Sequence, residues 1–151
     1  MLDSSEINAL ITDTIGTRLI KDYGGCLAQN QLPVEITPPY GAVIHSHASH
    51  VKEGHWFCLF INIYREGFWF CSYGIGPWGN AAKFLEKNCK YVTYNKRLIQ
   101  HLASETCGLH AANVLCRLLK GGRFINILQM YGVDTAINDK LVFENFKNLT
   151  I

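Results

Sequence analysis

The clearest hydrophobic pattern in the chain follows Cys107, where apolar residues recur every three or four positions and predict an amphipathic helix. One face of this helix carries Leu109, Ala112, Cys116 and Leu119. The glycine pair 121–122 ends the pattern, as glycine commonly does just past a helix end. The residues from 100 onward lack the pattern and predict a loop ending at Cys107, so the cysteine is expected in the first helical turn.

Shorter patterns of the same kind predict further helices over residues 81–87, 124–131 and 140–149. Residues 4–15 carry another apolar stripe, and Ser4 is expected to cap the start of that helix. Residues 26–40 are expected to form loops, because they contain Pro33, Pro38 and Pro39.

Two strongly apolar runs, 55–64 and 68–73, predict neighbouring β-strands. The link between them is short and contains Gly67, which indicates an antiparallel hairpin. Both runs are apolar on each face, as in central strands that helices cover from both sides. Further strands are expected over 40–45 and 90–94. The predicted fold class is therefore α+β: a small mixed central β-sheet packed against the Cys107 helix, with outer helices, in a single domain of residues 1–151.

The composition is typical of a globular domain, with 48% apolar residues and a net charge of only +2. This charge is much smaller than the positive charge typical of nucleic-acid-binding domains. No apolar run approaches the ~20 residues of a membrane span. The six cysteines lie mostly in apolar runs and are expected to be buried free thiols. No Cys-x-x-Cys pair is present, and solvation in a polar loop is expected, rather than metal binding, for His45, His47 and His50.

Cys107 is the candidate nucleophile. The positive end of the helix macrodipole is expected to stabilise its thiolate. A nucleophilic thiol also needs a base and an oxyanion stabiliser. His55 opens the first central strand beside Trp56, which is a suitable position for a base.

Several motifs together resemble the adenovirus-type cysteine proteases, the adenain family. They are a Ser-Ser-Glu start of the first helix, Gly54-His55-Trp56, the aromatic-x-x-aromatic-Gly turn at 70–74, and Gln-x6-Cys-Gly-Leu at 100–109. That family shares its papain-like fold class with the SUMO-deconjugating proteases. The resemblance implies that Cys107 is the nucleophile and His55 the general base. It also implies that the Gln100 amide and the Cys107 backbone N–H form the oxyanion hole.

One position departs from the family. Cys71 stands where the third member of the triad is normally Asp, Glu or Asn, and Ser72 follows it. A thiol is a poor acceptor for the imidazole N–H. Three interpretations stay open: a self-sufficient pair of Cys107 and His55, another acceptor such as Ser72 or a backbone carbonyl that orients His55, or weakened catalysis.

A second implied feature is Cys89, which corresponds to the cysteine that adenovirus enzymes link by a disulfide to a short activating viral peptide. The alternative is an incidental surface cysteine. Those enzymes also use DNA as a cofactor, and a phosphate backbone is one expected partner of the basic residues Lys83, Lys87, Lys90, Lys96 and Arg97. The alternative for these charges is a solvated face. No metal or small-molecule cofactor is expected.

The function implied by the resemblance is a viral maturation protease that cleaves capsid or core precursor proteins after Gly-Gly or Gly-x motifs. Its partners would be those precursors, the activating peptide and non-specific DNA, with no membrane. A monomer is expected, in the virion and in the nucleus or cytoplasm of the infected host cell. The alternatives are a ubiquitin- or SUMO-type deconjugating protease and a protease fold kept as a binding module.

Overall fold

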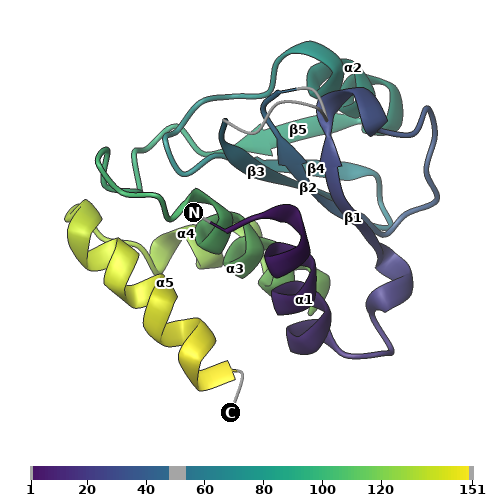
Figure 1. The fold of residues 1–151 in the computed structure, drawn as a ribbon. Helices are drawn as coiled ribbons and strands as arrows, with labels where there is room; N and C mark the ends of the chain where they lie inside the picture. Colours follow the sequence, from purple (N-terminus) through teal and green to yellow (C-terminus); the bar gives the residue numbers. More distant parts are fainter. Residues whose placement is uncertain (1, 48–53, 150–151) are drawn as a thin grey trace.

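The computed structural model describes residues 2–47 and 54–149 and confirms the predicted α+β fold class (Figure 1). In chain order the main elements are α1 (Ser4–Ile15), β1 (Tyr23–Ala28), β2 (Tyr40–His45), β3 (Trp56–Ile61), β4 (Glu66–Phe70), α2 (Gly79–Asn88), β5 (Tyr91–Tyr94), α3 (Cys107–Leu119), α4 (Phe124–Gln129) and α5 (Thr135–Leu149). Two short 3-10 helices, η1 (Ile20–Asp22) and η2 (Gln29–Gln31), flank β1.

The five strands form one mixed sheet in the order β1-β2-β3-β4-β5. Strands β2, β3 and β4 are antiparallel, whereas each edge strand is parallel to its neighbour. In the central strand β3, Cys58 lies opposite Val43 of β2 and Phe70 of β4. The hairpin of β3 and β4 is therefore the middle of the sheet, as its two apolar faces predicted.

Helices cover both faces of this sheet. Figure 1 shows α2 on one face and α1, α3, α4 and α5 on the other. Successive residues of β3 alternate between the two layers: Cys58 packs in the core with α1 and α3, and Phe57 packs in the core with α2. The nucleophile helix α3 is central to the first core, where Leu115 is completely buried.

The structure corrects several predicted boundaries. Strand β1 lies partly within the stretch 26–40 that was expected to form loops. Asp3, not Ser4, caps α1, because its side chain accepts a hydrogen bond from the Glu6 backbone N–H at 2.8 Å. The β-hairpin turn lies at 62–65 rather than at 65–67, and α5 begins at Thr135 rather than at residue 140. None of the helices within the described residues has the length and apolar character that a membrane span requires.

Candidate active site

Cys107 is the first residue of α3, and only 4% of its surface is exposed. It lies against the start of β3, where the backbone N–H of Trp56 favours its thiolate form. Gly108 makes this approach possible, because a Cβ there would lie 3.0 Å from Ile7 Cδ1 and 3.4 Å from Trp56 Cδ1. The glycine after the cysteine therefore lets α3 pack closely on both α1 and β3.

The residue before β3 is His55, and three neighbours fix its position. Its backbone N–H donates to Ser46 Oγ at 2.8 Å. Its ring stacks on Tyr73 with centroids 4.4 Å apart and an interplanar angle of 19°, and it meets the Phe57 ring edge-on at 4.7 Å. The rings of Tyr73 and Phe57 thus hold the imidazole in place.

Nε2 of His55 faces the segment that follows β4. Cys71 Sγ lies 3.8 Å away and Ser72 Oγ lies 3.4 Å away. The Ser72 hydroxyl donates its single hydrogen to Gln100 Oε1 at 2.6 Å, so toward His55 this oxygen is an acceptor. This assignment puts the hydrogen of a neutral His55 on Nε2 and leaves Nδ1 as the basic nitrogen. Within the described part of the chain, no carboxylate hydrogen-bonds the His55 ring.

Gln100 is completely buried beside these residues. Its backbone N–H donates to Ser72 O at 3.0 Å, and its side-chain Nε2 donates to Ser104 O at 2.9 Å. An amide nitrogen carries two hydrogens, and Ser104 O is its one acceptor among the residues described. One amide hydrogen therefore remains for another acceptor. The structure brings His55, Cys71 and Gln100 together through Ser72.

Asn95 is a site residue that sequence reasoning missed. It lies just after β5, is buried, and hydrogen-bonds the Cys71 backbone twice. The Cys71 N–H donates to Asn95 Oδ1 at 3.0 Å, and Asn95 Nδ2 donates to Cys71 O at 2.5 Å. Asn95 thereby fixes the end of β4 from which Cys71 and Ser72 approach His55. An asparagine directly after a predicted strand was the only available signal.

Burial shifts the pKa values of both His55 and Cys107. Burial lowers the pKa of His55 to about 4, and neighbouring His110 and His45 act in the same direction. Burial also raises the pKa of the Cys107 thiol, although the backbone N–H groups of Trp56 and Gly108 favour the thiolate. Both shifts favour a neutral thiol and a neutral imidazole in the resting state. The thiolate expected from the helix terminus stays a prediction, and burial of Cys107 opposes it.

The pH dependence of turnover tests this protonation state. Because the pKa of His55 is lowered to about 4, the imidazole stays a neutral base until the pH falls to that value. We expect kcat/KM to be flat at neutral pH and to fall only near pH 4, since kcat/KM reports groups of the free enzyme. Circular dichroism at each pH checks that the protein is folded. An acid limb near the ordinary histidine value of about 6.5 would contradict this result.

Cys89 lies away from this cluster, directly after α2. It is only partly exposed and packs on Gly67, where a Cβ would lie 2.6 Å from its Sγ. Burial raises the pKa of Cys89 to about 11, while Arg65 opposes the shift. Cys89 is therefore a partly buried thiol that ionises less readily than an exposed one, and a disulfide to a peptide stays a prediction.

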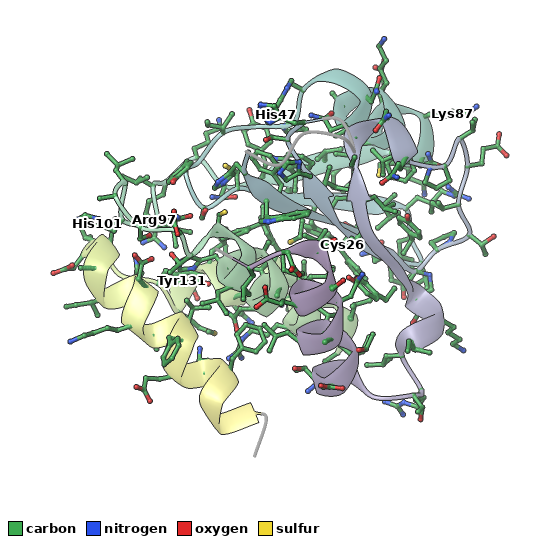
Figure 2. All side chains as sticks on the ribbon, in the orientation of Figure 1. Cys26, His47, Lys87, Arg97, His101 and Tyr131 are labelled. Atoms are coloured by element: carbon green, nitrogen blue, oxygen red, sulfur yellow. The ribbon has the colours of Figure 1, made fainter. Side chains whose placement is uncertain are left out.

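The basic residues near Cys89 are all exposed: Lys83, Lys87, Lys90, Lys96 and Arg97. Lys87 projects from α2 at the outer side of the molecule (Figure 2) and lies 3.7 Å from Glu35. Lys96 Nζ lies 5.7 Å from the Tyr94 ring centroid. Exposure is compatible with both a phosphate-binding face and a solvated one.

The three loop histidines have separate positions. His45 is buried at the end of β2, and its ring lies 4.6 Å from the Trp56 ring, so the prediction that it is solvated is wrong. His47 is exposed, as predicted, and His50 lies outside the described residues. The residues that the structure describes contain no group of three or more metal-ligating side chains.

Comparisons with known proteins identify the fold. Two solved structures of the ASFV pS273R protease are similar to this chain. One matches with a TM-score of 0.59 and 13% identity, covering 95% of this chain and 68% of the protease. The selenomethionine form matches with a TM-score of 0.52 and 17% identity, covering 74% of this chain and 42% of the protease. No protein-family model and no curated protein matches.

At these identities the similarity establishes the fold. The chain has the SUMO-protease-like fold of the adenain class, which confirms the fold that the resemblance implied. The match spans 42% of one solved chain and 68% of the other.

Proposed function

We propose that this chain is a cysteine endopeptidase in which Cys107 is the nucleophile, His55 the base and Gln100 an oxyanion-hole donor. The observation that carries the proposal is the hydrogen-bonded series from Gln100 through Ser72 to His55, at the start of the strand that contacts Cys107. This series couples the group that would bind the oxyanion to the group that would accept the proton. The protease fold supports the same reading.

The chemistry follows from the neutral resting state. As Cys107 Sγ attacks the scissile carbonyl carbon, its proton passes to Nδ1 of His55, and the carbonyl oxygen becomes an oxyanion. The free Gln100 amide hydrogen and the Cys107 backbone N–H would stabilise that charge. The imidazolium then protonates the leaving amine, and a thioester remains. Water, deprotonated by His55, hydrolyses the thioester and restores the thiol.

Ser72 takes the place of the missing carboxylate in this proposal. Its oxygen accepts the Nε2 hydrogen of His55 and so fixes the ring and its tautomer. The face of Tyr73 stacks on the imidazole and would stabilise the imidazolium once it forms. Of the three interpretations left open by the sequence, the contacts favour orientation of His55 by another acceptor, here Ser72.

Replacing Ser72 with alanine tests this role. We expect kcat to fall roughly 10- to 100-fold, because a hydrogen bond to a charged group contributes roughly 1.5–3 kcal/mol. The expected loss is in kcat rather than KM, since Ser72 acts on the imidazolium and not on the substrate. Steady-state kinetics with a peptide substrate measures it.

Cys71→Asp in the Ser72→Ala background is the matched rescue. Cys71 Sγ already lies 3.8 Å from Nε2, so a carboxylate at this position would reach the same nitrogen. We expect partial recovery of kcat together with a higher pKa of His55, which would move the acid limb upward. Unchanged kcat in Ser72→Ala would instead favour the self-sufficient pair of Cys107 and His55.

We also propose that the substrates are viral capsid or core precursors cleaved after Gly-Gly or Gly-x. The support is the resemblance of the sequence motifs to the adenain family and the similarity of the fold to a viral protease. An activating peptide at Cys89, DNA on the basic face and packaging in the virion belong to the same proposal. None of these is needed for the chemistry at Cys107.

A peptide-cleavage screen tests the proposed function. Peptides with Gly-Gly, Gly-Ala or Ala-Ala before the scissile bond are incubated with the chain, with and without double-stranded DNA, and products are identified by mass spectrometry. We expect cleavage after the glycine-containing motifs. Faster cleavage of a ubiquitin-ended substrate would favour a deconjugating protease, and no cleavage under any condition would favour a binding module.

A further inference from the structure

Two adjacent side chains of α5 hold the segment that joins Gln100 to Cys107. Asn138 Nδ2 donates to Ile99 O at 3.1 Å, next to Gln100. Asp139 Oδ1 accepts from Thr106 Oγ1 at 2.9 Å, next to Cys107. Asp139 Oδ2 also accepts from the His101 backbone N–H at 3.3 Å. Figure 2 shows His101 beside the first turns of α5, in agreement with this contact.

We propose that Asn138 and Asp139 are positioning residues that hold residues 99–107 in the conformation in which Gln100 and Cys107 face one oxyanion. This inference rests on the proposed protease function and extends it to α5, a helix with no residue in the catalytic series. The two side chains hold opposite ends of one loop.

Other hydrogen bonds of this segment lie within it: Gln100 Nε2 donates to Ser104 O at 2.9 Å, and Ser104 Oγ lies 2.9 Å from Thr106 Oγ1. Residues 100–106 contain no helix or strand, and most of them are exposed. Within the loop, the Ser104 N–H donates to His101 O at 3.0 Å, which closes only a local turn. Toward the sheet, the backbone N–H groups of Ile99 and Gln100 both donate to Ser72 O. Without α5, the end next to Cys107 would lose the hydrogen bond from Thr106 to Asp139.

A second network fixes Asp139 itself. His110 Nε2 lies 2.8 Å from Asp139 Oδ1, and the His110 side chain is fully buried. Tyr131 OH lies 3.2 Å from His110 Nδ1 and accepts from Asn113 Nδ2 at 3.1 Å. Each donor then has one acceptor: Asn113 donates to Tyr131, Tyr131 to Nδ1, and Nε2–H to the carboxylate.

The protonation of this network agrees with its geometry. Burial lowers the pKa of His110 although Asp139 opposes the shift, and burial raises the pKa of Tyr131. His110 is therefore neutral with one hydrogen, and the Tyr131 hydroxyl keeps its own. His110 lies one helical turn after Cys107 on α3, so the network ties the nucleophile helix to α5.

Thr106→Val removes the hydroxyl while keeping the shape of the side chain, and Thr106 makes no N-cap hydrogen bond that the change would destroy. We expect kcat for peptide cleavage to fall about 10²-fold at nearly unchanged KM, as for a small displacement of catalytic groups. Thr106→Ser keeps the hydroxyl and should restore most of kcat. Asp139→Ala should lower kcat at least as much.

Two readouts separate positioning from a merely structural role. Alkylation of Cys107 by iodoacetamide at pH 9 uses no oxyanion hole, so its rate should be unchanged in Thr106→Val. Hydrogen exchange of amides 99–106 should be faster in both Thr106→Val and Asp139→Ala. Asp134→Ala is the matched control. Asp134 Oδ1 accepts from the Ala136 and Ile137 N–H groups at the start of α5, and among the described residues its side chain makes no hydrogen bond to the loop.

The outcomes distinguish this proposal from the protease function. If wild-type protein cleaves and Thr106→Val has wild-type kcat, the positioning role is overturned while the protease function stands. A similar loss of kcat in Asp134→Ala would also overturn it, since general weakening of α5 would then explain the loss. If wild-type protein cleaves nothing, the protease function fails, and unchanged hydrogen exchange of the loop in both variants would still overturn the positioning role.

Discussion

Replacing Cys107 with alanine is expected to abolish peptide cleavage, with kcat falling roughly 10⁶-fold, the loss observed when a protease loses its nucleophile. Cys107 is the thiol at the start of α3 that the backbone N–H of Trp56 reaches. Without the sulfur, no thioester can form, and His55 and Gln100 have no attacking group to assist. Single-turnover assays with a fluorogenic peptide measure the loss.

Cys116→Ala is the matched control. Cys116 lies on the same helix, is 2% exposed and packs in the same core as Cys107. The Cys116→Ala substitution should lower thermal stability by a small amount and leave kcat unchanged. Equal loss of cleavage in both variants would show that α3 packing, rather than the Cys107 thiol, controls activity.

The second large effect is expected for His55→Ala, with a loss of kcat of similar order, because residues that act as a unit are strongly non-additive. In this variant, the alkylation of Cys107 should not show the loss that is expected when His55 maintains a resting thiolate. Since the resting pair is neutral, removal of the imidazole should leave the rate of iodoacetamide labelling of Cys107 at pH 7 almost unchanged. Peptide mapping after timed labelling measures this rate.

His45→Phe is the control for His55→Ala, because His45 is a buried histidine near the start of β3 whose ring lies 4.6 Å from the Trp56 ring. The substitution retains an aromatic ring, so kcat should stay near the wild-type value. A large loss of labelling at pH 7 in His55→Ala alone would contradict the neutral pair and favour a thiolate–imidazolium pair.

The parts of the fold that the sequence predicted well are those with strong local periodicity. Apolar spacing placed α3 correctly from Cys107 to Leu119, and the two apolar runs placed the central hairpin. Strand β1 was missed because it begins with Tyr23-Gly24-Gly25, and glycines weaken strand propensity. Gly24 is needed there, since a side chain would collide with the ring of Tyr40.

The site shows the same division between local and long-range information. The positions of Cys107, His55 and Gln100 came from motifs, and the structure brings the last two together through Ser72. The protonation state was not predictable, because it depends on burial by several elements at once. Asp139 and Thr106 are 33 residues apart in the sequence, and no sequence pattern predicts their hydrogen bond.

The most direct test of the central claim is capture of Cys107 by a Gly-Gly peptide that ends in a vinyl sulfone, followed by intact-protein mass spectrometry and peptide mapping at pH 7. We expect one adduct, on Cys107, that is absent in Cys107→Ala and strongly slowed in His55→Ala. As the thiol adds to the bound vinyl group, His55 takes its proton and passes it to the carbon next to the sulfone, a transfer that iodoacetamide labelling does not use. Cys116→Ala and Cys89→Ala should give the wild-type adduct. An adduct on Cys89 instead, or equal capture in wild-type and His55→Ala proteins, would contradict a nucleophile that His55 activates.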